Sequence, residues 1–191
     1  MKQRSPMPPQ IRPSTEEDVA QITRVYAHYV HTSTATYELE PPTPEEMSNR
    51  RSKILNLGLP YLVAEQDQEI VGYTYAGQYR PRPGYQFTIE DSVYIHPEHQ
   101  GQGLGQALLT ALIETCEQGP WRQMIAVIGD TANAASMRLH ERHGFRSMGT
   151  LYSVGWKFNR WVDSILMQRP LGSGNSLPAK DRPAKDRPAK D

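Results

Sequence analysis

The stretch VYIHPEHQGQGLG, residues 93–105, decides the fold of this chain. A short apolar strand, VYI, leads into a loop of alternating glycines, and the loop opens directly onto a helical segment, QALLTALIETC. Glycines leave backbone N–H groups unshielded, and the first N–H groups of a helix lack internal partners at the positive end of the helix dipole. Strand, loop and helix start together predict a pocket for a phosphate or pyrophosphate.

The spacing of the glycines separates the phosphate ligands. A dinucleotide fingerprint counted from Gly101 needs a glycine at position 106, which is Gln106, and a P-loop needs a G-K-[ST] tripeptide that does not follow. The chain instead reads Gln100-x-x-Gly103-x-Gly105. This resembles the R/Q-x-x-G-x-G/A loop with which GNAT N-acetyltransferases bind the pyrophosphate of an acyl-coenzyme A. The alternative is a glycine-rich turn that caps an ordinary helix.

A second segment, GDTANAASMRLHERHGF at residues 129–145, carries the same resemblance. It is similar to the GNAT pattern N-x-x-[AS]-x-x-[LF]-Y-E-x-x-G-F. Asn133 suits the N-cap of a helix, and Gly144 suits its C-cap. The resemblance implies that the Asn133 side chain contacts the pantetheine arm or the acyl region. His140 stands where many relatives carry a tyrosine that protonates the leaving thiolate, so the chain departs from the pattern there.

Longer stretches narrow the resemblance to one branch. The chain resembles the phosphinothricin acetyltransferases over residues 11–171. Four stretches carry this resemblance: TIEDSVYIHPEHQGQGLG, VIGDTANAASMRLHERHGF, GWKFNRWVDSILMQRPL and ATYELEPPTPEE. That branch implies an enzyme that acetylates the α-amino group of phosphinothricin, methionine sulfoximine, methionine sulfone and similar amino acids, commonly as a homodimer. Two alternatives stay open. One is another acceptor amine (a protein N-terminus, a polyamine or an aminoglycoside), and the other is a catalytically silent acyl-CoA-binding module.

The resemblance assigns acetyl-CoA binding to the strand and to the loop. The strand is expected to splay from its neighbour, so that pantetheine pairs with the main chain of Val93 and Ile95, and a backbone N–H there serves the oxyanion. The predicted acetyl-CoA-binding residues are Val93, Tyr94, Ile95, Gln100, Gly101, Gln102, Gly103, Leu104, Gly105 and Asn133.

Two side chains are candidates for proton transfer, because an amine must lose a proton before it attacks a thioester. Glu90 lies in the strand FTIEDSVYI, where the branch carries its proposed general base, and Asp91 is its competitor. Strand alternation puts Thr88 and Glu90 on one face and Asp91 on the other, unless a bulge shifts the phase. His140, with an ordinary pKa of about 6.5, suits a base or an acid, and a histidine held for packing is the alternative.

Arginines near the middle of the chain suit an amino-acid acceptor. Arg80 and Arg82 each precede a proline in YRPRPGY, which favours extended backbone and places them on one side. Such a pair can grip an α-carboxylate, and two exposed surface arginines are the alternative. The resemblance places Tyr37 and Glu38 on the acceptor side, and Thr88 shares the face of Glu90. These five residues are the predicted substrate-binding set.

Composition excludes several other functions. Lys plus Arg and Asp plus Glu each number 21, so there is no basic surplus for nucleic acid. No apolar run is long enough for a membrane span, and no apolar leader marks a signal peptide. The single Cys116 forms no internal disulfide and is expected to pack, in a cytoplasmic protein. Three H-x-x-H pairs lack the further ligands of a zinc site, so no metal is expected.

The order of the patterns predicts one α/β domain with a mixed sheet and helices on both faces, which is the GNAT topology. The domain is expected at residues 11–171, between a flexible segment 1–10 and a disordered tail 172–191 with PAKD repeats. Strands are expected at 10–12, 61–66, 70–79, 87–95, 124–129, 147–155 and 161–169. Helices are expected from Ser14 or Thr15 to about His31, and at 46–57, 103–117 and 133–143. Trp156, Phe158 and Trp161 are expected to pack in the core, close to a dimer interface.

Overall fold

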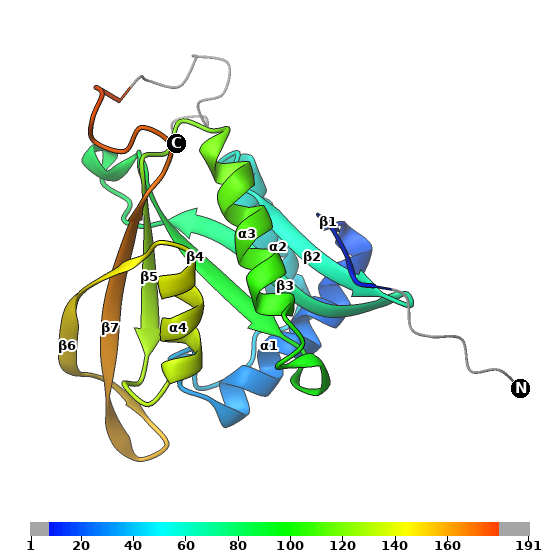
Figure 1. Cartoon of the computed structure of the whole chain (residues 1–191). Helices are drawn as coiled ribbons and strands as arrows, with labels where there is room; N and C mark the ends of the chain where they lie inside the picture. The colour runs from blue at the N-terminus through cyan, green and yellow to red at the C-terminus, as the bar shows by residue number, and fades with distance from the viewer. Residues whose placement is uncertain (1–7, 180–191) are drawn as a thin grey trace, which may run out of the picture.

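The strands of the computed structural model, which describes residues 8–179, form one mixed sheet (Figure 1). In sheet order they are β1 (Gln10–Pro13), β2 (Tyr61–Gln66), β3 (Glu69–Gln78), β4 (Thr88–Ile95), β5 (Gln123–Gly129), β7 (Arg160–Pro170) and β6 (Arg146–Lys157). Neighbouring strands are antiparallel, except that β4 and β5 run parallel. The predicted α/β architecture with a mixed sheet is therefore confirmed.

Four helices cover the two faces of the sheet (Figure 1). Helices α1 (Val19–Thr32) and α2 (Pro44–Asn56) pack on one face, against β2, β3 and β4. Helices α3 (Leu104–Glu117) and α4 (Ala134–Arg142) pack on the other, α3 against β2, β3 and β4 and α4 against β5. Short 3-10 turns lie at Glu16–Asp18, Pro83–Tyr85 and Pro97–His99.

Local sequence chemistry explains where the helices begin. The Thr15 N–H donates to the Asp18 carboxylate at 2.7 Å, which closes a capping box before α1. Helix α2 starts at Pro44, two residues before the predicted start at Glu46, so that prediction was wrong at this end. Proline is favoured in the first turn because its missing N–H would have no helical partner, and the Thr43 hydroxyl caps the Glu46 N–H.

Each face of the sheet has its own hydrophobic core. On the α1 side, stacked tyrosines dominate, with Tyr61 and Tyr73 almost fully buried. On the α3 side, leucines of α3 pack against Met124 and Met167 of β5 and β7. Cys116 is buried in this second core, as predicted. The two cores hold β4 between them, which fixes the strand that carries Glu90.

The last two strands expose apolar side chains instead of burying them. Trp156, Phe158 and Trp161 are each at least half exposed, so their predicted place in the core was wrong. Strand β6 is the last in the sheet order, and most of its side chains are exposed. We call the exposed apolar residues of this hairpin the β6 patch, and they are Met148, Leu151, Tyr152, Val154, Trp156, Phe158 and Trp161.

The chain continues beyond β7 in turns that pack on the domain. The Arg122 guanidinium donates to the Ser173 hydroxyl at 2.6 Å, and the Gly174 N–H donates to the Leu171 carbonyl at 2.9 Å. The predicted tail, 172–191, thus begins with a segment in contact with the fold. Residues 1–7 and 180–191, which include most of the two predicted flexible ends, lie outside the described residues. Within residues 8–179, no helix is long and apolar enough to cross a membrane.

Candidate active site

The glycine loop takes the conformation that its sequence predicts. Gly101 and Gly103 have φ of +74° and +83°, in the left-handed region that strains other residues. Gly103 is the N-cap of α3, and the first backbone bond of the helix runs from the Ala107 N–H to the Gly103 carbonyl. A Cβ atom added at Gly101 or Gly103 would meet nothing within 4 Å. The loop therefore presents the N-terminus of α3 to an anion without obstruction.

Tyr29 of α1 ties this loop to the end of β4. Its hydroxyl donates to the Ile95 carbonyl at 2.6 Å and lies 3.3 Å from the Ile95 N–H, and Gln100 Nε2 donates to it at 3.1 Å. The main chain of Ile95, predicted to pair with pantetheine, is thus already engaged. Sequence reasoning missed Tyr29, because its partners lie 66 and 71 residues away along the chain.

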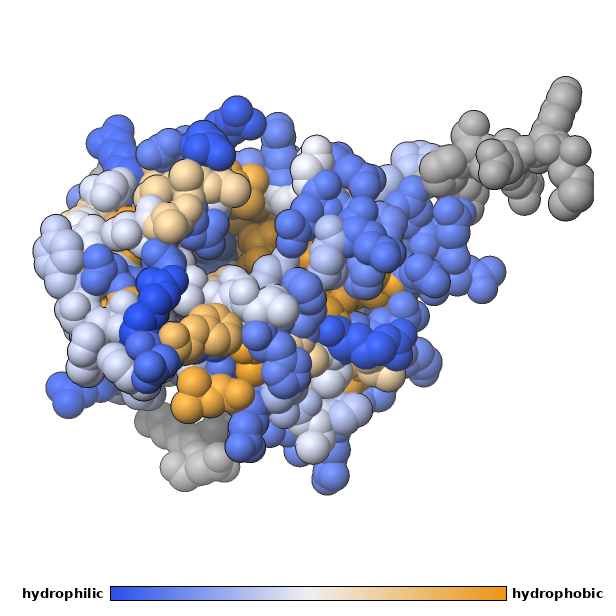
Figure 2. Space-filling view, turned by 90° about the horizontal axis from the view of Figure 1, so that it is seen from below, coloured by the Kyte–Doolittle hydropathy of each residue, from blue (hydrophilic) through white to orange (hydrophobic). Residues whose placement is uncertain are grey.

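Strands β4 and β5 separate beside the loop. They pair only from Thr88 to Glu90, although β4 continues to Ile95 (Figure 1). The His96 N–H donates to β3, so by alternation the main chain of Val93 points the other way, toward the side that β5 has left. Figure 2 shows a hollow with a hydrophobic floor at this end of the molecule. Of the three strand residues predicted to bind acetyl-CoA, Val93 is the one whose main chain faces this separation without the bonds that Tyr29 makes to Ile95, whereas Tyr94 packs in the tyrosine core.

Glu90 lies at the last paired position, where the two strands part. Burial raises its pKa to about 7, the negative charge of Asp91 acts in the same direction, and Arg80 opposes both. Register between β3 and β4 runs without a slip, so no bulge disturbs the alternation there. Glu90 and Asp91 therefore point to opposite faces, as predicted. A carboxyl that titrates near neutrality suits a general base.

Asp91 forms a buried pair with His140 on the α3 and α4 side of the sheet. His140 Nε2 lies 3.0 Å from Asp91 Oδ2, and Nδ1 lies 2.7 Å from the Ser136 carbonyl. Burial disfavours the His140 cation, but the hydrogen bond and charge of Asp91 outweigh burial, so the pKa of His140 lies above its ordinary value. Both ring nitrogens are engaged by protein groups.

The predicted arginines lie in the exposed loop between β3 and β4. Arg80 stacks on the Tyr79 ring, with Cζ 5.1 Å from the ring centroid, and its charge acts on Glu90. Arg82 precedes the turn Pro83–Tyr85 in extended backbone, and its side chain is exposed. Thr88 is half-buried at the start of β4. Among these, Arg80 is the residue that the structure links to Glu90.

Tyr37 and Glu38 are held by the protein itself. The Tyr37 hydroxyl donates to the Asp163 carbonyl and contacts the Ser164 hydroxyl, both at 2.9 Å. The Glu38 carboxylate accepts from Arg50 at 2.5 Å and from the Tyr26 hydroxyl at 2.9 Å. These contacts fasten the segment between α1 and α2 to the rest of the domain.

Lys157, at the end of β6, also holds the segment between α1 and α2. Its ammonium donates to the Ser33 and Thr36 carbonyls at 2.7 Å each, and the residue is 2% exposed. Burial lowers its pKa. Nothing in the sequence around Lys157 indicates this role, because the partners come from a segment more than 120 residues away.

Asn133 caps α4, as predicted. Its side-chain oxygen accepts from the Ser136 N–H at 3.2 Å, and Gly144, with φ of +81°, follows the end of the helix. The amide nitrogen of Asn133 remains as a donor. The cap therefore leaves the side chain equipped for the contact that the resemblance implies.

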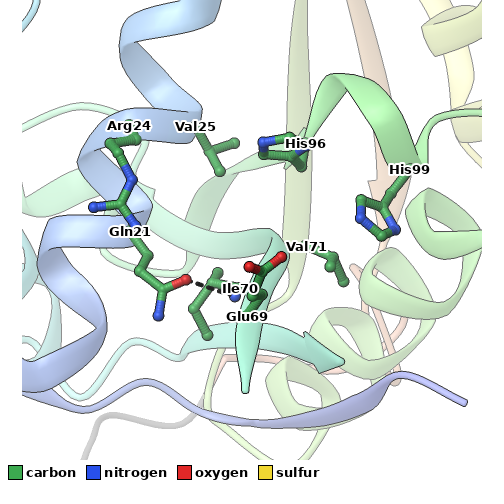
Figure 3. A pocket seen from close by; sticks show the side chains of 8 residues that line it. All are labelled: Gln21, Arg24, Val25, Glu69, Ile70, Val71, His96 and His99. Carbon is green, nitrogen blue, oxygen red and sulfur yellow. Dashed lines mark hydrogen bonds between the residues drawn. The ribbon is translucent and has the colours of Figure 1, made fainter. Parts of the chain in front are cut away.

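A cavity of about 210 Å³ lies away from these groups, between α1, the start of β3 and the loop after β4 (Figure 3). Its lining contains none of the predicted site residues. Two of its residues, His96 and His99, form one of the H-x-x-H pairs, and their ring centroids lie 5.7 Å apart. Among residues 8–179, no group of three or more His, Cys, Asp or Glu side chains is arranged to hold a metal ion.

The sheet order, the separated strands β4 and β5 and the glycine loop at α3 define an acyltransferase of the GNAT fold. The acetyltransferase (GNAT) family matches residues 21–145, and the chain belongs to this family. It is an N-acetyltransferase, as the sequence predicted.

Individual relatives are similar over most of the chain. The phosphinothricin N-acetyltransferase of Alcaligenes faecalis is 54% identical over 166 residues, covering 87% of this chain and 84% of that protein. The L-methionine sulfoximine/L-methionine sulfone acetyltransferase of Salmonella typhimurium is 39% identical over 162 residues, covering 84% and 94%. The crystal structure of a GNAT superfamily phosphinothricin acetyltransferase from Sinorhizobium meliloti, in complex with AcCoA, matches with a TM-score of 0.89 and 40% identity, covering 94% and 97%. The predicted branch is thereby confirmed.

Proposed function

We propose that this enzyme transfers the acetyl group of acetyl-CoA to the α-amino group of a small amino acid or analogue of the phosphinothricin or methionine sulfoximine type. The observation that carries the proposal is Glu90, a half-buried carboxyl with a pKa of about 7 at the point where β4 and β5 part, with Arg80 acting on it. The names of the similar enzymes support the class of acceptor.

In this proposal the donor occupies the separation between β4 and β5. The loop from Gln100 to Gly105 and the N-terminus of α3 receive the pyrophosphate, since open space and left-handed glycines leave their N–H groups accessible. Asn133 and the main chain of Val93 meet the pantetheine arm. The complex of the Sinorhizobium meliloti relative with AcCoA supports the choice of donor.

The chemical step needs one base and one hydrogen-bond donor. Glu90 takes a proton from the acceptor ammonium, directly or through water, and the neutral amine attacks the thioester carbon. The Val93 N–H stabilises the oxyanion that forms on the carbonyl oxygen. Collapse of this intermediate breaks the C–S bond. The nitrogen gives up its second proton to water, and the leaving thiolate of coenzyme A takes a proton from water, so that the net products are the amide and the free thiol. We assign His140 an indirect part, because both of its ring nitrogens are engaged and it is 5% exposed.

Arg80 gives the acceptor its orientation in this scheme. A guanidinium binds a carboxylate in a bidentate manner, so Arg80 fixes the α-carboxylate while Glu90 faces the α-amino group. Arg82 and Thr88 complete the acceptor site from the same loop and strand. Tyr37 and Glu38 contribute by holding the segment between α1 and α2, since their polar atoms are bonded within the protein.

The proposal extends to assembly and location. The β6 patch supports a homodimer, because seven exposed apolar side chains gather on the last hairpin of the sheet. The single cysteine, Cys116, is buried and forms no disulfide, which supports the cytoplasm as the compartment.

The test is free-thiol release from acetyl-CoA with five acceptors offered separately: phosphinothricin, methionine sulfoximine, methionine sulfone, spermidine and an aminoglycoside. We expect turnover with the three amino acids and its collapse in Glu90→Gln. Turnover on the polycations alone would overturn the acceptor class. Binding of acetyl-CoA without turnover on any amine would instead identify a silent acyl-CoA-binding module.

A further inference from the structure

We propose that the buried Asp91–His140 pair is a positioning element for the Glu90 base. The pair holds the negative charge of Asp91 next to Glu90, on the opposite face of the same strand. This charge favours proton uptake by the Glu90 carboxylate at neutral pH. This inference rests on the proposed function, in which Glu90 is the base.

The hydrogen bonds of His140 determine the charge of the pair. The Ser136 carbonyl only accepts, so Nδ1 carries a proton toward it at 2.7 Å. Nε2 then faces the Asp91 carboxylate at 3.0 Å, and that contact also needs a proton. The hydrogen bond and the charge of Asp91 raise the pKa of His140, which favours this proton on the ring. We therefore assign the pair as an imidazolium against a carboxylate, with both side chains at most 6% exposed.

The negative end of the pair lies nearer to Glu90 than the positive end. Asp91 follows Glu90 directly in β4, whereas His140 belongs to α4 and reaches the strand through Asp91. Asp91 Oδ1 is buried and has no hydrogen-bond partner among the described residues, so the charge on that oxygen is poorly screened. In surroundings of low dielectric constant, such a charge acts more strongly on a neighbouring carboxyl than it would in water, and it adds to the larger effect of burial on Glu90.

The groups around Glu90 and the pair act in both directions. Asp91 raises the pKa of Glu90, and Arg80, from the loop before β4, lowers it. The charge of Glu90 acts on Tyr75 of the neighbouring strand β3, and the charge of Asp91 acts on Cys116 of α3. Burial raises the pKa values of Tyr75 and Cys116, so both are neutral at pH 7. Asp91 and Arg80 are therefore the charged groups that act on Glu90 directly, in addition to burial, and His140 acts through its contact with Asp91.

A purely structural role explains the pair less well. Removing two charges from water costs free energy that their mutual attraction only partly offsets, so a buried ion pair contributes little net stability. The unpaired Oδ1 adds to that cost. An electrostatic effect on Glu90 gives the pair a function for which both charges are needed.

The experiment compares pH–rate profiles of kcat/KM for the acceptor in wild type, Asp91→Asn, His140→Gln and the double variant. Asp91→Asn preserves the shape of the side chain and removes the negative charge, so the acid limb moves down by about one pH unit. His140→Gln removes the compensating cation, so the limb moves up. The double variant follows Asp91→Asn. The inference would be overturned if the acid limb of the pH–rate profile stays in place while kcat/KM falls. It would also be overturned if the acid limb moves in the same direction in both single variants.

Two further measurements separate this inference from the proposed function. In Glu90→Gln the acid limb disappears if Glu90 is the base, whereas a limb that persists rejects the base itself. A ¹³C carboxyl NMR titration of Glu90 in the free enzyme reports its pKa without turnover, and we expect a lower value in Asp91→Asn. A kcat loss of about 100-fold in His140→Gln alone, with the limb unmoved, would give His140 direct contact with the reacting groups and overturn the inference.

Discussion

At Glu90, activity and stability oppose each other. The folded protein holds the carboxyl with a pKa of about 7, whereas an unfolded chain leaves it at about 4.3. The protonated side chain therefore stabilises the fold at low pH, and this contribution is lost as the pH rises from the unfolded pKa through the folded one. At pH 8 the enzyme carries an ionised carboxylate that its surroundings disfavour.

Glu90→Gln tests both sides of this balance. We expect the variant to lose about 100-fold or more in kcat/KM, because general-base catalysis contributes effects of that size. The same variant should gain about 1–2 kcal/mol in free energy of unfolding at pH 8, and nothing at pH 4. Urea unfolding at the two pH values measures the gain. A variant that is destabilised at pH 8 would contradict the cause given for the pKa of Glu90.

Arg80 is the second residue whose role is measurable alone. Arg80→Ala should lower kcat/KM for an amino-acid acceptor about 10- to 100-fold, since a hydrogen bond to a charged group contributes about 1.5–3 kcal/mol. The KM for acetyl-CoA should not change. Arg82→Ala, measured in parallel, shows whether the second arginine shares the contact. Arg146→Ala, which removes an exposed arginine at the start of β6, is the matched control.

At the scale of elements, the loop before α3 depends on backbone conformation. Gly103→Ala should strain the N-cap by about 1–2 kcal/mol, because φ of +83° disfavours any residue with a Cβ atom. We expect the KM for acetyl-CoA to rise about 10-fold and the KM for the acceptor to stay constant. Gly84→Ala is the control, because its φ is not positive and a Cβ there meets open space. Equal effects of the two variants would contradict this account of the loop.

The elements also show how far sequence reasoning reaches. Every predicted helix and strand exists, because periodicity, caps and turn residues act within a few positions of one another. Alternation in β4 correctly predicted that Glu90 and Asp91 lie on opposite faces of the sheet. The spacing of the glycines predicted the loop at the start of α3. Contacts across the sheet could not be predicted this way. The partners of Asp91, Tyr29 and Lys157 lie 49 to 124 residues away, and single-chain patterns do not encode them.

The exposure of the aromatic side chains on the last hairpin could not be predicted, for a related reason. Trp156, Phe158 and Trp161 read as core residues, since aromatic side chains usually are. Strand β6 is the final strand of the sheet order, which leaves these side chains exposed in the single chain. A sequence pattern reports that a face is apolar, and it does not report what covers that face.

At the scale of the whole molecule, the β6 patch predicts the oligomeric state. Val154→Glu combined with Trp161→Glu places two charges on the patch, and we expect a dimer to become a monomer in sedimentation. Leu177→Glu, at an exposed apolar residue outside the patch, should leave the dimer intact. A monomeric wild type, or a double variant that stays dimeric, would reject the patch as the interface.

The parallel contact between β4 and β5 also divides the sheet. Strands β1 to β4 and strands β5 to β7 are each antiparallel throughout, and the two groups meet through three residue pairs from Thr88 to Glu90. Beyond Glu90, each group has a strand edge inside the molecule that the other group does not pair, although Tyr29 engages the main chain of Ile95. An edge of this kind is a site at which other chains add strands and aggregation begins. In the proposed complex the donor would cover part of that edge, so acetyl-CoA would protect the enzyme from such aggregation in addition to supplying the acetyl group.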